Sequence, residues 1–210
     1  MTSLTELSQK YNTDKKPENH NYIPMYEFWL KDKSIRKMLE VGFGSGASAR
    51  MWEEYYPNAE IHIMESLGSE YSDIWGKPDI SISRVSVIVG DSTNPEDWKT
   101  IAADFDLIID DGSHNPDDQI ATFYNGFAKL KSGGLYFIED THCNFEKKFT
   151  DRDKLYPWVR NLIVTQQLPG IQTGFDYPGN FYAVRHILQG LSRDILSFHF
   201  YKSIIMFEKA

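Results

Sequence analysis

The segment 37–48, KMLEVGFGSGAS, constrains the fold more than any other part of the chain. A strand-like apolar run ends at Val41 and is followed by three glycines, Gly42, Gly44 and Gly46, after which a helical pattern begins. Glycine permits positive φ and lets a ligand approach the main chain closely. The first turn of a helix offers unpaired N–H groups and a positive dipole. We therefore predict a strand, a tight turn and a helix that together bind a small molecule carrying polar or anionic groups.

Apolar and β-branched runs alternate with helical patterns along the rest of the chain. We predict strands at 36–41, 61–65, 84–89, 105–109 and 135–138, and helices at 24–30, 47–56, near 71–75, 94–102, 116–130, near 153–167 and 181–191. Two final runs, 195–200 and 203–208, predict a terminal hairpin joined at 201–202. This order predicts an α/β fold with a doubly wound, mostly parallel, seven-stranded Rossmann-like sheet and a C-terminal antiparallel hairpin.

Composition narrows the class of protein. A length of 210 residues is that of a single domain. The net charge of −8, without a cluster of basic residues, argues against nucleic-acid or anionic-membrane partners. The single cysteine, Cys143, allows no internal disulfide. No signal peptide is expected and no apolar run is long enough for a membrane span, so a cytoplasmic location is expected. Segment 1–34 is interpreted as an arm or lid, with a solvated arm as the simpler alternative for its first 23 residues.

Acidic residues stand at the carboxyl ends of the predicted strands, where open α/β sheets bind their ligands. They are Glu65, Asp91, Asp110, Asp111, Glu139 and Asp140. Carboxylates placed side by side in this way repel one another unless they bind cations or hydroxyl groups. The alternative is that single residues of this set cap the helices that follow them.

The glycine turn fits two kinds of cofactor. Gly42, Gly44 and Ala47 also satisfy the dinucleotide pattern, and Glu65 has the right spacing to bind a ribose in either case. A dinucleotide fold continues with a second βαβ half, whereas this chain is predicted to end in a hairpin. Asp91 is placed to bind an adenine. These two features favour S-adenosylmethionine over a dinucleotide.

The order of the glycine turn, Glu65, Gly90-Asp91 and a terminal hairpin resembles the class I S-adenosylmethionine-dependent methyltransferases. Four motifs together resemble, among these, the metal-dependent sugar O-methyltransferases of the mycinamicin and tetracenomycin type. They are KYNTDK at 10–15, IDDGSH at 109–114, GGLYFIEDTH at 133–142 and FYKS at 200–203, beside the glycine turn. The resemblance implies one methyltransferase domain over 1–210. It also implies cofactor contacts from Glu40, Gly42, Gly44, Gly46, Glu65, Asp91, Ser92 and Asp110.

The acids at 111 and 139–140 also predict a metal site on chemical grounds. Asp111, Glu139 and Asp140 offer hard oxygen ligands from two adjacent strand ends, which suits Mg²⁺. His114 is a candidate general base, a role that the resemblance also gives it, and the alternative is a turn residue bonded to the backbone. His142 is interpreted as a rival base or a residue that supports the metal ligands.

These predictions combine into an Mg²⁺-dependent transfer of a methyl group to a sugar hydroxyl, with His114 and Asp111 as the catalytic residues. The expected acceptor is a small molecule that contains a sugar, such as a glycosylated natural product, and a homo-oligomer is left open. Segment 143–190 is interpreted as an insertion over the acceptor site, rich in the aromatic residues Phe145, Tyr156, Trp158, Phe175, Tyr177, Phe181 and Tyr182. The alternatives are an NAD-dependent oxidoreductase or epimerase and a non-catalytic binding or assembly protein.

Overall fold

The computed structural model describes residues 2–66, 82–167 and 193–210, and these contain a seven-stranded sheet in the order β3-β2-β1-β4-β5-β7-β6. The strands are β1 (Lys37–Val41), β2 (Glu60–Glu65), β3 (Val85–Val89), β4 (Phe105–Asp110), β5 (Leu130–Ile138), β6 (Ile195–Tyr201) and β7 (Ile204–Lys209). The first five are parallel, and β7 runs antiparallel to both β5 and β6. The predicted doubly wound sheet with a terminal hairpin is confirmed.

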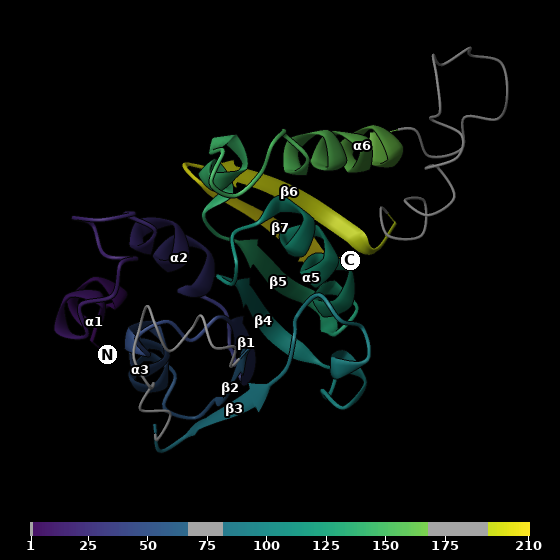
Figure 1. Cartoon of the computed structure of the whole chain (residues 1–210). Coiled ribbons are helices and arrows are strands. Elements are labelled where there is room, and N and C mark those ends of the chain that lie inside the picture. The colour runs from purple at the N-terminus through teal and green to yellow at the C-terminus, as the bar shows by residue number, and fades with distance from the viewer. Residues whose placement is uncertain (1, 67–81, 168–192) are drawn as a thin grey trace, which may run out of the picture.

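Helices cover both faces of this sheet (Figure 1). One face packs against α1 (Leu4–Lys10), α2 (Ile23–Leu30) and α3 (Ala47–Tyr55), and the other against α5 (Pro116–Phe127) and α6 (Leu155–Gln167). Strand β4 shows why: Leu107 and Ile109 belong to the first core, whereas Ile108 belongs to the second. All six residues of β4 are buried, as expected for a central parallel strand covered on both faces.

Two predicted elements differ from the structure. The helix expected at 94–102 is only the short 3₁₀ helix η1 (Asp97–Lys99). There the Asn94 side chain accepts from the Glu96 N–H, and the Asp97 carboxylate accepts from the Asp91 N–H at 2.8 Å, so local side-chain bonds compete with a longer helix. Segment 131–134, expected to cap a helix, lies inside β5, because α5 already ends at Phe127.

The N-terminal segment is folded onto the body of the protein. Helix α1 begins at a capping box formed by Ser3 and Glu6, and Leu4 and Leu7 are fully buried in the first core. The alternative of a solvated arm over the first 23 residues is therefore wrong. The sequence pattern does not predict α1, because a helix of seven residues is too short to show a clear helical period of apolar residues.

The region after β5 is described in part. It contains the 3₁₀ helix η2 (Thr141–Phe145) and α6, which matches the helix predicted near 153–167. Phe145 is 68% exposed and stacks on Tyr156, whereas Trp158 packs on Phe123 in the second core. The other four aromatic residues of the predicted acceptor region, and the helices predicted near 71–75 and at 181–191, lie outside the described residues.

Candidate active site

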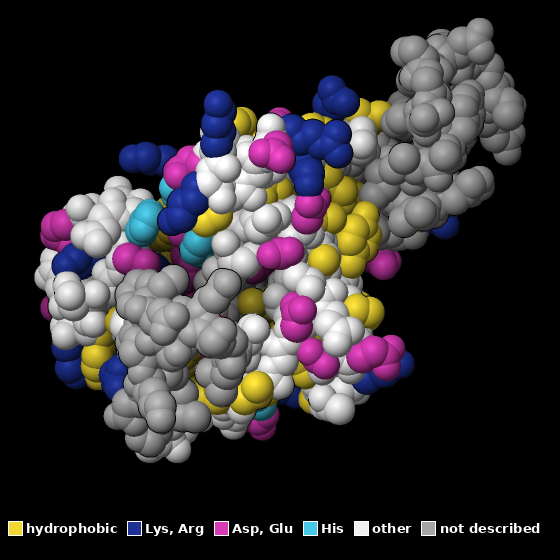
Figure 2. Space-filling view, viewed as in Figure 1, with side chains coloured by type: hydrophobic (Ala, Val, Ile, Leu, Met, Phe, Trp, Pro, Cys, Tyr) yellow, Lys and Arg dark blue, Asp and Glu magenta, His cyan; other side chains and the backbone are white. Residues whose placement is uncertain are grey.

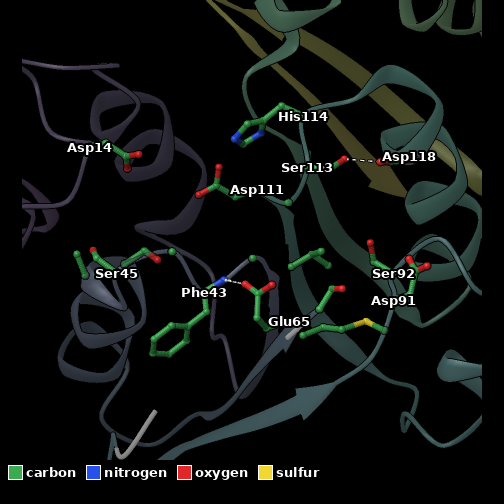
Figure 3. A pocket seen from close by; sticks show the side chains of 18 of the residues that line it. Asp14, Phe43, Ser45, Glu65, Asp91, Ser92, Asp111, Ser113, His114 and Asp118 are labelled. Atoms are coloured by element: carbon green, nitrogen blue, oxygen red, sulfur yellow. Dashed lines mark hydrogen bonds between the residues drawn. The ribbon is translucent and has the colours of Figure 1, made fainter. Parts of the chain in front are cut away.

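A pocket of about 720 Å³ lies at the carboxyl ends of β1–β4 (Figure 3). Figure 3 shows Asp14 and Ser45 on one side of it, Asp91 and Ser92 on the opposite side, and His114 above. Its wall is built from the turns that follow the four strands and from the loop after α1. The lining residues are 12–14, 41–45, 47, 48, 64–66, 90–93, 111–114 and 118.

The glycine turn brings two of these strand ends into direct contact. Gly42 has φ +95°, and a Cβ there would lie 2.2 Å from the main-chain oxygen of Asp111. Only glycine fits such a position. Val41 accepts the Asp111 N–H at 3.0 Å, so the turn after β1 and the acidic loop after β4 are held together by main-chain contacts.

Three of the predicted cofactor-binding side chains line this pocket. Glu65 accepts the Phe43 N–H at 2.7 Å, and burial raises its pKa. Asp91 accepts from both the N–H and the hydroxyl of Thr93, at 2.8 and 2.7 Å, which fixes its orientation. The Ser92 hydroxyl lies 2.8 Å from that of Thr122. Together with Gly42 and Gly44, these residues form part of the pocket wall, and their contact with a cofactor stays a prediction.

Glu40, Gly46 and Asp110 do not line the pocket but lie beneath or beside it. Glu40 is fully buried, accepts the Ser48 hydroxyl at 2.9 Å, and has its pKa raised to about 7 by burial. Asp110 is 2% exposed, and burial raises its pKa well above the usual value. Gly46 caps α3 in a left-handed conformation. Contact of these three residues with a cofactor stays a prediction.

Next to the pocket, Asp111, His114 and Asp140 bring their ligand atoms within 4.8 Å of one another. His114 Nε2 lies 3.6 Å from Asp140 Oδ2. His114 and Asp140 both have positive φ, +59° and +53°, which is strained for residues other than glycine and is concentrated at functional sites. Figure 2 shows histidine side chains grouped with acidic ones on this side of the molecule. Two carboxylates and an imidazole in this arrangement suit a divalent cation or a proton transfer.

Glu139, the third predicted metal ligand, faces the interior instead. It is 1% exposed, and its carboxylate accepts from Lys15 at 2.8 Å and from the Tyr26 hydroxyl. Burial and repulsion from Asp111 raise the pKa of Glu139 well above its usual value. The structure therefore groups Asp111 and Asp140 with His114, and the role of Glu139 as a ligand stays a prediction.

His142 and His62 differ in their surroundings, and Cys143 is buried. His142 Nδ1 lies 3.8 Å from Asp140 Oδ1, as a residue that supports Asp140 would. His62 packs against Phe105, away from the pocket, and burial lowers its pKa. Cys143 is 4% exposed, and burial raises the pKa of its thiol to about 11, as expected for an unreactive cysteine.

Several residues at the site come from the N-terminal segment, which the sequence analysis interprets as an arm or lid without assigning individual site residues to it. Asn12, Thr13 and Asp14 line the pocket, and Lys15 lies behind it among the carboxylates. The motif KYNTDK at 10–15 marks this place, but neither periodicity nor spacing connects it to the strand ends.

The chain is similar to known proteins in sequence and in fold. No family model matches the chain. It is 33% identical over 149 residues to mycinamicin VI 2''-O-methyltransferase of Micromonospora griseorubida, covering 65% of this chain and 35% of that protein. It is 31% identical over 150 residues to demethylmacrocin O-methyltransferase of Streptomyces fradiae, covering 65% and 36%. The structure of MycE methyltransferase in complex with Mg and S-adenosylhomocysteine (SAH) matches all of this chain and 55% of that one, with a TM-score of 0.79 and 26% identity.

The chain is a homologue of sugar O-methyltransferases and has the class I methyltransferase fold. The resemblance inferred from the motifs is thereby confirmed. This methyltransferase-like chain spans just over a third of the length of the curated relatives it matches. Among residues 2–66, 82–167 and 193–210, no helix combines the length and apolar content that crossing a bilayer needs.

Proposed function

We propose that the chain catalyses the transfer of a methyl group from S-adenosylmethionine to a sugar hydroxyl, with Mg²⁺ at the acidic cluster and His114 as general base. The acceptor is a glycosylated natural product, a nucleotide sugar or a polysaccharide sugar. One observation carries the proposal: Asp111 and His114 belong both to the glycine-turn pocket and to the cluster with Asp140. A methyl-donor site and a metal site would thus share a wall, and MycE binds Mg and SAH.

The pocket fits the methyl donor. Its volume is in the range of small-molecule sites. The main chain at Gly42 allows close approach, and the carboxylates of Glu65 and Asp91 suit the hydroxyl and amino groups of a nucleoside. These side chains are already fixed by hydrogen bonds to Phe43 and Thr93, so little ordering is required on binding.

The cluster fits a hard divalent cation. Asp111 and Asp140 would supply oxygen ligands, with Glu139 behind them, and this donor set favours Mg²⁺ over softer metals. When bound, the metal lowers the pKa of a coordinated hydroxyl and orients it, and the sulfonium of the donor activates the methyl carbon.

His114 then accepts the proton of the acceptor hydroxyl. Asp140 Oδ2 lies 3.6 Å from its Nε2, so the imidazole ring stands beside the acidic cluster. The positive φ of both residues fixes their directions relative to the pocket. The remaining work of the chain is alignment of the hydroxyl with the methyl carbon, because in-line displacement depends on close positioning of the two atoms.

Binding and turnover experiments test the proposal. SAH should stabilise the protein in a thermal-shift assay, whereas NAD(H) should not. Radiolabelled S-adenosylmethionine should transfer its methyl group to members of a panel of deoxysugar-bearing macrolides and aromatic polyketides, and EDTA should abolish the transfer. Stabilisation by NAD(H) but not by SAH would refute the proposal, and full activity in EDTA would refute the role of the metal.

Variants of the site separate chemistry from donor binding. Asp111→Asn and His114→Ala should each lower kcat about 10²–10⁴-fold while SAH affinity changes little, because neither change removes the glycine turn or Glu65. Asp117→Asn is the matched control, since Asp117 pairs with Lys154 outside the pocket. Rates of the two site variants equal to that of the control would contradict the assigned roles.

A further inference from the structure

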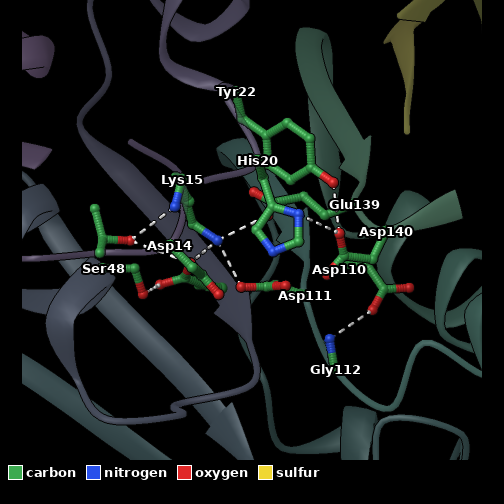
Figure 4. Close-up of polar contacts among 12 residues, drawn as sticks. Asp14, Lys15, His20, Tyr22, Ser48, Asp110, Asp111, Gly112, Glu139 and Asp140 are labelled. Atoms are coloured by element: carbon green, nitrogen blue, oxygen red, sulfur yellow. Dashed lines mark hydrogen bonds and ion pairs between the residues drawn. The ribbon is translucent and has the colours of Figure 1, made fainter. Parts of the chain in front are cut away.

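Lys15 lies fully buried among three carboxylates that are far from it in sequence (Figure 4). Its Nζ is 2.5 Å from Asp111 Oδ2, 2.8 Å from Glu139 Oε2 and 3.6 Å from Glu40 Oε1. The side chain is therefore held by ion pairs to these carboxylates, behind the proposed metal site.

Two tyrosines of the same segment hold the other acids. The Tyr22 hydroxyl donates to Asp140 Oδ1 at 2.5 Å, and the Tyr26 hydroxyl donates to Glu139 Oε1. Their exposed fractions are 3% and 0%. The main-chain oxygen of Lys15 accepts the Tyr22 N–H at 3.0 Å, so the segment is folded in a way that presents the donors together. Each of the three predicted metal acids thus receives a donor from residues 15–26.

Stability alone does not account for this arrangement. Replacing buried ionic groups by apolar ones of similar volume is often neutral or stabilising, so a buried ion pair is weak evidence for a stabilising role. The packing of the segment is already supplied by apolar residues: Leu4, Leu7, Ile23, Met25 and Leu30 are all buried in the first core. The polar donors act on carboxylate geometry instead, as the outer partners of metal ligands commonly do.

We propose that Lys15, Tyr22 and Tyr26 are positioning residues that hold Asp111, Glu139 and Asp140 in the geometry required to bind a divalent cation. The inference rests on the proposed function, because it concerns the metal half of that site. Lys15 binds one oxygen of Asp111, while the Asp111 side chain keeps 19% of its surface exposed and lines the pocket. Segment 15–26 is then part of the active site through these three positioning residues.

The test measures metal binding directly. Tyr22→Phe and Tyr26→Phe each remove one hydroxyl and keep the ring, and Lys15→Met removes the ammonium and keeps most of the stem. Mn²⁺ is used in place of Mg²⁺ because it prefers the same oxygen ligands. The concentration of free Mn²⁺ is measured by electron paramagnetic resonance. Each variant should weaken Mn²⁺ binding by about tenfold or more, the effect typical of residues that support metal ligands, with SAH affinity within about twofold of the unmodified chain.

Tyr11→Phe is the matched control. Tyr11 lies in the same N-terminal segment, and its hydroxyl also donates to a carboxylate, that of Glu54, but this pair is on the surface. Its removal should change neither Mn²⁺ nor SAH affinity. Thermal unfolding of all variants separates loss of fold from loss of binding. If Lys15→Met does not fold, the Mn²⁺ affinities of the two tyrosine variants test the proposal.

The outcomes distinguish the inference from the function on which it rests. If the unmodified chain binds SAH and Mn²⁺ and the tyrosine variants bind Mn²⁺ equally well, the inference is overturned and the proposed function stands. Mn²⁺ binding by a folded Lys15→Met variant that is as tight as before, or tighter, overturns the part assigned to Lys15. If the unmodified chain binds no Mn²⁺, both the metal role and the inference fail.

Discussion

Gly42→Ala should damage the fold and the metal site together, because the added methyl group would collide with the backbone of Asp111. The Cβ would lie 2.2 Å from the Asp111 oxygen and 2.9 Å from its carbonyl carbon. To restore an ordinary van der Waals separation, the two segments must move apart by roughly 1.2–1.8 Å. The hydrogen bond from the Asp111 N–H to Val41, 3.0 Å long, resists this movement.

The size of the effect follows from two terms. Overpacking of this kind costs about 1–3 kcal/mol. A non-glycine residue at φ +95° adds about 1–2 kcal/mol of backbone strain. A loss of about 3 kcal/mol corresponds to a fall in Tm of ~6–12 °C for a domain of this size. Displacement of Asp111 by a comparable distance should also weaken Mn²⁺ binding by about tenfold or more.

Gly44→Ala provides the comparison within the same turn. Gly44 also has positive φ, +50°, but a Cβ there would meet no described atom within 4 Å. Its expected cost is only the strain, about 1 kcal/mol, or ~2–4 °C in Tm. Thermal unfolding and Mn²⁺ titration of both variants measure the difference. Equal Tm values and equal Mn²⁺ affinities for the two variants would refute the coupling between the glycine turn and Asp111.

Two further predictions concern the packing of the N-terminal helix and the reactivity of the thiol. Leu7→Ala should lower the free energy of unfolding by about 2–5 kcal/mol, because Leu7 is fully buried. Gln9→Ala, on the exposed side of α1, is the control. Equal denaturation midpoints for the two variants would show that α1 does not pack on the core. Cys143 should react slowly with iodoacetamide at neutral pH, because burial raises its pKa to about 11 and each pH unit below that value lowers the thiolate fraction tenfold. A rate that levels off near neutral pH would contradict the raised pKa.

The sheet was predictable because its strands carry their own signals. The fully apolar core of β4 and the glycines after β1 indicate a buried strand and a tight turn without knowledge of any partner. The predicted elements differ from the structure where local side-chain hydrogen bonds or a very short helix determine the conformation. At 94–102, side-chain bonds from Asn94 and Asp97 shorten a helix that the pattern extends, and α1 is too short for its period to be read.

The candidate site was predictable only in the part that strand ends supply. Asp111, His114 and Asp140 follow β4 and β5, and adjacent parallel strands bring their carboxyl ends to one edge. Lys15 bonds to Asp111 and Glu139 across 96 and 124 residues of sequence. No periodicity or spacing rule specifies a contact of that kind, because it depends on how the N-terminal segment packs on the finished sheet.

These long-range contacts change the interpretation of the acidic residues at the strand ends as a metal site. A row of carboxylates requires cations or hydroxyl groups, and the fold supplies one ammonium, from Lys15, and two hydroxyls, from Tyr22 and Tyr26. Part of the charge that indicated an external metal in the sequence is therefore balanced from within. Glu139 is the clearest case, since internal donors bind both of its oxygens, whereas Asp111 remains partly exposed beside His114 and Asp140. The three predicted ligands therefore differ in their surroundings: Asp111 lines the pocket, whereas both oxygens of Glu139 accept hydrogen bonds from Lys15 and Tyr26.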